Sequence, residues 1–484
     1  MKLLHANDER GRHAPSWYAA TAGGSSHPML ERHVEADVCI VGGGYTGLAA
    51  ARELALRGHS VVLLEAHRVG WGASGRNGGQ LGSGFNVDQP TLERTLGLTR
   101  AHALWDIAEQ GKRLVRELDA EPGTDLQYRA GIIDAAHRAR DVAPRHRAAE
   151  HLAREYGHDA LEPLDRAALR ALVASDDYHG GVLDHGAGHL HPLRLAHALA
   201  DAAGRAGATL HEHSEVLRIE GLASRGVAME GPTLAGDIEV LARTGRARPG
   251  RTRPGRTRPG RTRPGRTRPG PTRPDRRPRL VTAAGSVRAE HVVLAANGYL
   301  DALVPGIARH VMPINNFILV TEPLGERARA LLPGDHAVAD SRFVVNYFRR
   351  TADDRLLFGG GESYGYRFPR DMARRTRRAM LGVFPDLADV RIGHAWGGTL
   401  AITPSRLPHV ARLTPGLIAA GGYSGHGVGL AIATGQAIGA ALDGEDDRLT
   451  LLEALPTGRF PGGRRARTPL LALAMTGARW LDRL

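Results

Sequence analysis

The stretch ADVCIVGGGYTGLAAARELALRGHSVVLLEA, residues 36–66, decides the fold of this chain. Its apolar run starting at Val38 is typical of a strand buried on both faces of a parallel sheet. A glycine turn, an Ala/Leu-rich helix that ends at Gly58 and a second apolar run over 60–64 follow. This order predicts a βαβ unit and therefore an α/β fold with a doubly wound parallel sheet.

The glycines of this unit have the spacing of a dinucleotide-binding turn. Gly42 permits a tight turn, Gly44 lets a pyrophosphate approach the backbone, and Gly47 lets the helix pack against the strand. The diphosphate would then lie at the positive end of the helix. Glu65, eighteen residues after Gly47, is placed to accept hydrogen bonds from an unphosphorylated ribose. A carboxylate there disfavours NADP and leaves FAD and NAD as alternatives.

Two further glycine-rich segments favour FAD over NAD. RVGWGASGRNGGQ, residues 68–80, is a loop whose backbone amides can follow a diphosphate and then a flat ring. LIAAGGYSGHGVGLAIATGQAIGAAL, residues 417–442, is typical of a strand, a glycine turn and a long apolar helix. The N-terminus of that helix is a second positive site, suited to the electron-rich edge of a reduced flavin.

These segments resemble the flavin motifs of the D-amino-acid oxidase/glycine oxidase superfamily. The resemblance rests on residues 42–47, 72–80 and 422–427, and extends along nearly the whole chain. It is greatest to the γ-glutamylputrescine oxidoreductase branch, on further segments such as 174–196 and 347–361. It implies FAD-dependent oxidation of an amine C–N bond to an imine and then an aldehyde. Oxygen is the expected acceptor, which gives hydrogen peroxide.

The resemblance also implies two discontinuous domains. A Rossmann-like FAD-binding domain is expected over 36–110, 180–300 and 390–445. A mixed α+β substrate domain is expected over 111–179 and 301–389, and would roof the flavin.

The residues that the resemblance assigns to the cofactor come from the βαβ unit, from the glycine-rich segments and from three later segments. Those expected to bind FAD are Gly42, Gly44, Tyr45, Thr46, Gly47, Glu65, Ala66, Arg68, Gly72, Ala73, Ser74, Gly75, Arg76, Asn77, Gly78, Gly79, Gln80, Val216, Ala295, Ala296, Gly298, Gly398, Gly425, His426, Gly427 and Val428. The candidate catalytic residues are His426 and Gln80, expected beside the flavin ring, and Tyr347, expected with Arg349 on the strand above it. A packing role is an open alternative for each.

Cysteine and lysine positions bear on how FAD is held and reoxidised. Sarcosine oxidases of this superfamily bind FAD covalently through a cysteine, whose position corresponds to Gly398 here. Cys39, the single cysteine, falls in the first strand, so we expect non-covalent FAD. Some relatives activate oxygen with a lysine, but Lys2 and Lys112 are both predicted to lie away from the flavin. Whether the enzyme is an oxidase or a dehydrogenase stays open.

The residues after Ser-Gly-His-Gly bear on the substrate. Relatives that oxidise small amino acids hold the substrate carboxylate there with a basic residue, and this chain has Val428 and Gly429. A small amino acid would lose its principal charge partner. γ-Glutamylputrescine or a similar polyamine derivative is therefore the expected small-molecule substrate, and an FAD-dependent amino-acid oxidase or dehydrogenase is the alternative.

An R-T-R-P-G repeat accounts for the basic character of the chain. Residues 243–279 contain fifteen arginines and one aspartate, a net charge of +14 against +13 for the whole chain, which leaves −1 elsewhere. Proline at every fifth position blocks helix, and the repeat offers no apolar residues for a core. We predict a disordered insertion at a hairpin tip, between 213–221 and 280–298. Nucleic acid is not an expected partner, and an RNA-directed flavin enzyme that uses this basic loop is the alternative.

The rest of the chain is typical of a cytoplasmic enzyme. A single cysteine excludes an internal disulfide, and the N-terminus lacks the apolar run of a signal peptide. No stretch is long and apolar enough for a transmembrane segment. His185, His189 and His191 have no acidic partner at ligand spacing, so no metal site is expected. A C-terminal tail or helix over 446–484 could dock on the body or on a second subunit, which leaves the oligomeric state open.

Overall fold

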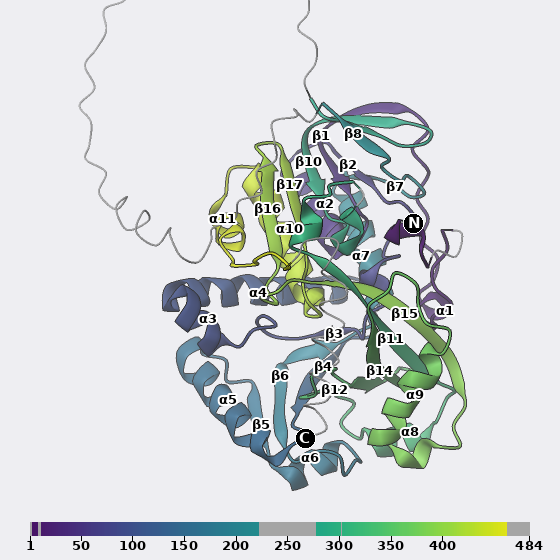
Figure 1. The fold of residues 1–484 in the computed structure, drawn as a ribbon, viewed down its shortest axis with the longest axis vertical. Helices are drawn as coiled ribbons and strands as arrows, with labels where there is room; N and C mark the ends of the chain where they lie inside the picture. Colours follow the sequence, from purple (N-terminus) through teal and green to yellow (C-terminus); the bar gives the residue numbers. More distant parts are fainter. Residues whose placement is uncertain (1, 8–10, 222–276, 302, 462–484) are drawn as a thin grey trace, which may run out of the picture.

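The computed structural model describes residues 2–7, 11–221, 277–301 and 303–461. Within these residues the chain forms two β-sheets, each with its own set of helices (Figure 1). Most of the predicted insertion at 243–279 and of the predicted tail at 446–484 lies outside the described residues.

The first sheet contains the βαβ unit predicted from residues 36–66. Six of its strands are, in spatial order, β16 (His409–Thr414), β17 (Leu417–Gly421), β10 (Ser286–Leu294), β1 (His33–Val41), β2 (Val61–Leu64) and β7 (Thr209–His211). β9 (Arg279–Val281) also pairs with β10, and β8 (Arg218–Glu220) pairs with β9. From β17 to β7 the neighbouring strands run parallel, as the buried apolar runs predicted.

Three helices pack beside one another against this sheet: α2 (Tyr45–Leu56), α7 (Pro192–Arg205) and α10 (Gly427–Leu442). Small residues explain how closely they approach. A Cβ at Gly435 in α10 would lie 2.4 Å from the carbonyl oxygen of Thr46 in α2. The small residues of both helices therefore allow their backbones to pack close together.

The hairpin β8–β9 carries the insertion. Glu220 lies opposite Arg279 in an antiparallel pair, so the two ends of the segment between them are neighbours. Arg279, which we had included in the insertion, is the first residue of β9. The predicted place of the insertion at a hairpin tip is confirmed by these two strands.

The second sheet is largely antiparallel. Its strands, in spatial order with the last appended to β6, are β15 (Ile392–Ile402), β11 (Met312–Thr321), β14 (Leu356–Ser363), β13 (Tyr347–Arg350), β12 (Ala337–Asp340), β4 (Arg129–Ala135), β6 (Gly181–His189), β3 (Gln80–Leu81) and β5 (Leu161–Leu164). β12 and β4 are the parallel neighbours. An apolar cluster that includes Phe348, Phe358 and Phe384 packs this sheet against α9 (Met372–Val383).

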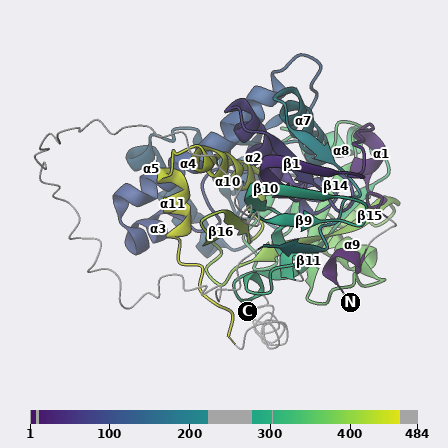
Figure 2. The same ribbon diagram turned by 90° about the horizontal axis from the view of Figure 1, so that it is seen from above.

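A long helix, α4 (Leu98–Asp119), crosses between the two halves and packs against α10 (Figure 1). Seen from above, α3, α5 and α11 lie at one end of the molecule and α1, α8 and α9 at the other (Figure 2). The remaining α-helices are α1 (Trp17–Thr21), α3 (Gln89–Leu96), α5 (Val142–Tyr156), α6 (Arg166–Leu172), α8 (Glu326–Leu331) and α11 (Asp447–Glu453). The 3₁₀ helices are η1 (Leu3–His5), η2 (Ala73–Gly75), η3 (Ala139–Asp141), η5 (Asn297–Asp301), η6 (Ile307–Arg309) and η7 (Pro385–Leu387).

The division of the chain into domains stays a prediction, but three strands pair differently from it. β3 falls within 36–110, β6 within 180–300 and β15 within 390–445, the ranges assigned to the FAD-binding domain, yet all three belong to the second sheet. The physical reason is that an alternating or apolar strand does not reveal which sheet it joins, because strand pairing is a non-local contact.

Within the described residues, every helix is too short or too polar to cross a lipid bilayer.

Candidate active site

A cavity of about 700 Å³ is lined by residues of both sheets. Its walls come from the first turns of α2 and α10, the loop around η2, the ends of β2 and β10, and the strands β11, β13, β14 and β15. The predicted FAD-binding residues that line it are Gly42, Gly44, Tyr45, Thr46, Glu65, Ala66, Gly72, Ala73, Ser74, Arg76, Asn77, Gly78, Gln80, Val216, Ala295, Ala296, Gly398, Gly425, His426, Gly427 and Val428. Tyr347 lines the cavity as well.

Five predicted FAD-binding residues do not line the cavity: Gly47, Arg68, Gly75, Gly79 and Gly298. Three of them let backbone pass close to backbone. A Cβ at Gly47 would lie 2.0 Å from the carbonyl oxygen of Gly42, and one at Gly75 would lie 2.3 Å from that of Gly70. At Gly79 the φ angle is +76°, and a Cβ would lie 2.1 Å from the Leu190 carbonyl oxygen.

The other two have different surroundings. Arg68 lies 3.6 Å from the buried carboxylate of Glu212. A Cβ at Gly298 would lie 3.3 Å from the Ala401 side chain. These five residues shape the loops around the cavity and do not form its wall.

The turn after β1 is held tightly on both sides. Gly42 has a φ of +112°, and a Cβ there would lie 2.9 Å from the backbone of Ala295. Ser74 lies across the turn, and its hydroxyl accepts a hydrogen bond from the Tyr45 amide over 3.1 Å. The positive N-terminus of α2 is thereby directed at the cavity, where it favours an anionic group.

Glu65 closes this end of the cavity beyond β2. Its carboxylate accepts hydrogen bonds from the amides of Gly43 over 2.7 Å and His67 over 2.9 Å. Burial raises the pKa of Glu65 to about 7, and the nearby Glu212 carboxylate adds to the effect, while the two amides act against it. The side chain remains part of the cavity wall and is placed to accept further hydrogen bonds.

The loop over 68–80 is built by its own side chains. Asn77 accepts a hydrogen bond from the Gly79 amide over 2.7 Å and donates to the carbonyls of Ala73 and Ser74. The buried Arg76 donates to the Trp71 carbonyl over 2.7 Å and to the Gly397 carbonyl of β15 over 3.2 Å. The loop is therefore preformed and attached to the second sheet.

His426 lies at the start of α10, opposite this loop. Burial and the ammonium group of Lys112 lower the pKa of His426, so the imidazole is neutral at pH 7. Its ring packs on Gly82, where a Cβ would lie 2.8 Å from the ring. Its Nε2 is buried without a hydrogen-bond partner among the described residues. His426 is part of the cavity wall, and a neutral imidazole nitrogen can accept or donate a hydrogen bond.

Lys112, which we expected to lie away from the flavin, is buried behind His426. Its ammonium group donates to the Ser83 hydroxyl over 2.5 Å and lies 2.9 Å from the Glu109 carboxylate. Its Cγ is 3.7 Å from the position of a Cβ at Gly429. Lys112 does not line the cavity, but it places a cation beside the first turn of α10.

Sequence reasoning missed this position because the contact is tertiary. The one signal in the sequence was Gly111, a glycine in the middle of a predicted helix. A Cβ at Gly111 would lie 2.2 Å from the Gly429 carbonyl oxygen, so the glycine lets α4 approach α10 closely.

Tyr347 and Gln80 face the cavity from the second sheet. The hydroxyl of Tyr347 donates to the side-chain oxygen of Asn316 over 2.5 Å, and burial raises the pKa of Tyr347, so the phenol is neutral. Its ring lies between two glycines, since a Cβ at Gly78 or Gly359 would lie within 2.7 Å of it. The side-chain amide of Gln80 donates to the Val338 carbonyl over 2.9 Å.

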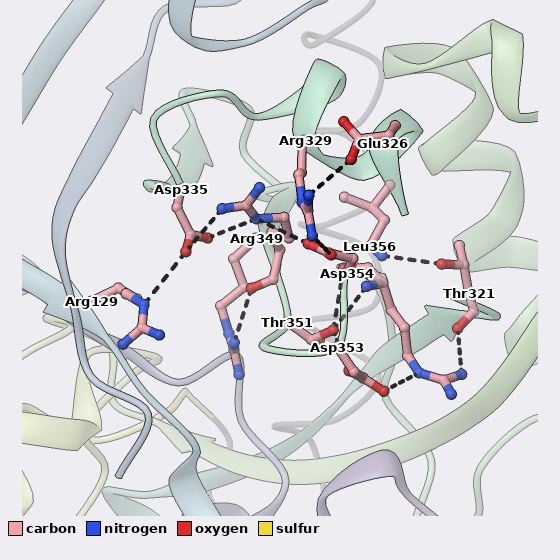
Figure 3. A network of polar contacts seen from close by, with 12 residues as sticks. Arg129, Thr321, Glu326, Arg329, Asp335, Arg349, Thr351, Asp353, Asp354 and Leu356 are labelled. Atoms are coloured by element: carbon pink, nitrogen blue, oxygen red, sulfur yellow. Dashed lines mark hydrogen bonds and ion pairs between the residues drawn. The ribbon is translucent and has the colours of Figure 1, made fainter. Parts of the chain in front are cut away.

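Arg349 supports the wall and does not line the cavity. It donates to the carbonyls of Gly78 over 2.9 Å and Leu190 over 3.1 Å. Beyond it, ion pairs join Arg329 to Asp354 over 2.7 Å at the far end of the β13–β14 hairpin (Figure 3). The turn that follows β13, the strand of Tyr347, is thus anchored.

Sequence reasoning missed several polar residues of the cavity wall, and three of them come from the second sheet or from the turn that follows it. Asn316 lies in β11, Glu362 in β14, and Arg406 in the turn after β15. The Glu362 carboxylate accepts a hydrogen bond from the Tyr364 hydroxyl over 2.9 Å. Each lies in an irregular or alternating segment with no motif around it, so nothing in the sequence distinguishes it from an exposed polar residue.

The three histidines considered for a metal site have separate partners. His185 pairs with Glu162, His189 hydrogen-bonds the Asp335 carbonyl, and His191 hydrogen-bonds Thr21. In the part of the chain that the structure describes, no three His, Cys, Asp or Glu side chains gather in a way that could hold a metal ion.

The chain resembles known proteins along most of its length. Residues 37–253 and 266–441 match the family model described as DAO, FAD dependent oxidoreductase. The chain is 38% identical over 469 residues to "Probable oxidoreductase OrdL" of Rhizobium meliloti, covering 97% of each. It is 36% identical to "Gamma-glutamylputrescine oxidoreductase" of Escherichia coli, covering 98% of this chain and 99% of that protein.

Among solved structures, glycine oxidase from Geobacillus kaustophilus superposes with a TM-score of 0.63 at 22% identity. The superposition covers 85% of this chain and 95% of the glycine oxidase chain. L-amino acid deaminase from Proteus myxofaciens also superposes with a TM-score of 0.63, at 17% identity, and covers 88% and 94%. At these identities the likeness concerns the fold.

Proposed function

Because this chain belongs to the DAO family of FAD-dependent oxidoreductases, we propose that it oxidises the amine of γ-glutamylputrescine or of a similar acylated polyamine. The observation that carries the proposal is similarity along almost the entire chain to γ-glutamylputrescine oxidoreductase, at 36% identity. We further propose that oxygen is the electron acceptor, which yields hydrogen peroxide.

The residues of the cavity fit FAD. The N-terminus of α2 and the glycine turn before it suit the diphosphate, and Glu65 suits the ribose hydroxyl groups. Gly425 lines the cavity, and a Cβ there would meet nothing within 4 Å, so this turn leaves open space next to the first turn of α10. We propose that these residues, with the first turn of α10, hold the cofactor.

Non-covalent attachment is part of the proposal. Gly398 lines the cavity and has no side chain to form a bond. Cys39 is fully buried in β1, does not line the cavity, and burial raises the pKa of its thiol.

FAD, when bound, accepts a hydride equivalent from the carbon next to the amine nitrogen. The protein then has to orient the substrate and to keep its amine neutral, since the lone pair must be available to form the imine. An enclosed wall favours the neutral amine because desolvation disfavours the charged form. We propose that Tyr347 and Asn316, which are joined by a hydrogen bond and line the cavity, orient the amine. The imine C=N bond is then hydrolysed by water to an aldehyde and ammonia.

The surroundings of α10 support a substrate longer than an amino acid. Val428 contributes an apolar side chain to the cavity, and Gly429 faces Leu81 and Lys112, not the cavity. The first turn of α10 therefore offers no basic side chain to a carboxylate next to the reacting carbon. A lysine or arginine placed at 429 would point away from the cavity, so it would not create such a partner.

The test is anaerobic stopped-flow reduction of the holoenzyme by a panel of amines. γ-Glutamylputrescine should bleach the flavin absorbance about ten- to a hundredfold faster, per concentration, than glycine, sarcosine or D-alanine, the factor that one charge-assisted hydrogen bond supplies. N-Acetylputrescine is the matched control for the amide without the glutamyl charges. Faster reduction by sarcosine or a D-amino acid would refute the substrate and leave the FAD chemistry intact. Peroxide formation in air tests the acceptor separately.

A further inference from the structure

The turn between β15 and β16 carries the chain directly from the second sheet to the first, and its arginine, Arg406, is part of the cavity wall. This turn, residues 403–408, follows β15 and precedes β16. The Thr403 amide donates to the Ser424 hydroxyl over 3.2 Å, and the Thr403 hydroxyl donates to the Leu407 carbonyl over 2.7 Å. The turn is thus fixed to the Gly-rich segment before α10, and Arg406 at its tip is part of the cavity wall.

The backbone of Arg406 is held in an unfavourable conformation. Its φ is +65°, in the left-handed region where glycine or asparagine is preferred over an arginine. An arginine at such a position costs conformational energy, and strain of this kind concentrates at ligand-binding sites. The side chain, and not the turn, is therefore the reason for an arginine here.

The guanidinium of Arg406 lacks the partners that the other basic groups of the cavity possess. Lys2 pairs with Glu215 over 3.0 Å, and Arg76 donates to two backbone carbonyls. The Arg406 guanidinium lies 5.6 Å from the ring centre of Phe343, and no described residue gives it a hydrogen-bond acceptor or an ion pair. A cation in a cavity wall with unused donors is a site for a carboxylate.

Part of the cavity wall is apolar. Ile314, Leu400 and Ile402 line the cavity from β11 and β15, and Phe343 is 41% exposed beside Arg406. An aliphatic spacer can pack on such a wall while its two ends meet polar groups. Arg406 lies in the turn after β15, whereas Tyr347 and Asn316, the pair proposed to orient the amine, lie in β13 and β11.

We propose that Arg406 binds a carboxylate of the substrate that is separated from the reacting amine by an aliphatic spacer. The inference rests on the proposed function and deepens it, because it names the group that selects an amine with a remote carboxylate. Arg406 is a specificity residue, and the chemical step does not depend on it.

The experiment compares two substrates that differ in one group. One is γ-glutamylputrescine, and the other is the same molecule with its carboxylate converted to a carboxamide. Holoenzyme variants Arg406→Met and Arg406→Gly remove the cation; the glycine also relieves the left-handed strain, so it guards against a folding defect. Arg406→Lys keeps the charge. Arg100→Met removes an exposed arginine of α4 outside the cavity and is the matched control.

The wild-type enzyme should prefer the acid over the carboxamide by about ten- to a hundredfold in the second-order rate constant for flavin reduction. Arg406→Met and Arg406→Gly should abolish this preference by slowing the acid alone, Arg406→Lys should retain part of it, and Arg100→Met should retain all of it. Binding gives an independent readout. The γ-N-butyl amide of glutamate, which lacks the reacting amine, should perturb the flavin spectrum, and its Kd should be raised by a similar factor in Arg406→Met and Arg406→Gly.

An unchanged preference in Arg406→Met and Arg406→Gly overturns the inference. Equal reduction of the wild-type enzyme by the acid and the carboxamide overturns it as well, and both outcomes leave the proposed function standing. If neither substrate reduces the wild-type flavin while another amine does, the proposed function fails and the inference fails with it.

Discussion

Glu65 makes the stability of the apoprotein depend on pH in a way that one substitution should reveal. Its pKa is raised from 4.5 to about 7, and the sign follows from this direction. The favourable contribution of the protonated carboxyl is fully present below pH 4.5 and is lost as pH rises to 7. A difference of 2.5 pKa units corresponds to about 3 kcal/mol, an upper limit for a side chain that borders a cavity.

Glu65→Gln removes the charge and keeps the shape. The amide oxygen can still accept from the Gly43 amide, but its NH₂ group cannot accept from the His67 amide, and an unsatisfied donor costs about 2 kcal/mol. At pH 5 the wild type has already lost about 1 kcal/mol of the contribution of the protonated carboxyl, so the variant should be less stable than wild type by about 1 kcal/mol. At pH 8.5 it should be more stable by about 1 kcal/mol, with equal stability near pH 6.

The assay is urea unfolding of FAD-stripped protein, followed by circular dichroism, at pH values from 5 to 8.5. Glu212→Gln is an informative second variant, because the Glu212 carboxylate contributes to the raised pKa of Glu65 and its loss should weaken the pH dependence. Reconstitution with FAD supplies a further readout, since Glu65→Gln should weaken FAD binding if the carboxylate accepts the ribose hydroxyls. A stability difference between wild type and Glu65→Gln that stays constant from pH 5 to 8.5 would refute the reasoning.

Three further outcomes follow from the structure. Acid precipitation should release all flavin as FAD, because Cys39 is buried in β1; flavin retained in the pellet would contradict non-covalent binding. Lys112→Met should lower the free energy of unfolding by about 1–3 kcal/mol, because it leaves the partly buried Glu109 carboxylate without its cation, and adding Glu109→Gln should restore part of this loss in urea unfolding. Joining Glu220 to Arg279 by an Asn-Gly turn, as their antiparallel pairing permits, should leave FAD content and the rate of flavin reduction unchanged. A folded variant whose flavin is no longer reduced by substrate would show that the removed segment takes part in function.

The FAD half of the cavity could be predicted from sequence because its determinants are local. Gly42, Gly44 and Glu65 belong to one βαβ unit, in which spacing along the chain fixes spacing in the fold. The same reasoning also assigned Gly47 and Gly79 to FAD binding, although these glycines only permit close backbone contacts. A glycine that touches a ligand and a glycine that touches backbone look alike in a sequence.

The substrate half could not be predicted in the same way. Asn316 and Glu362 come together because β11 and β14 are paired with a particular register, and a single sequence does not encode that register visibly. Lys112 is brought to α10 by helix packing across more than 300 residues. The strands β6 and β15 were assigned to the other domain for the same reason, since their partners are distant in sequence.

The position of Arg406 connects these two halves. β15 belongs to the second sheet and β16 to the first, so the chain passes directly from one sheet to the other at the turn that carries Arg406. Thr403 attaches that turn to Ser424, two residues before His426 at the start of α10. A carboxylate bound at Arg406 would therefore be held relative to both sheets at once. The length of the aliphatic spacer would then set where the amine reaches, and substrates with shorter or longer spacers should lose reactivity even when both of their ends are bound.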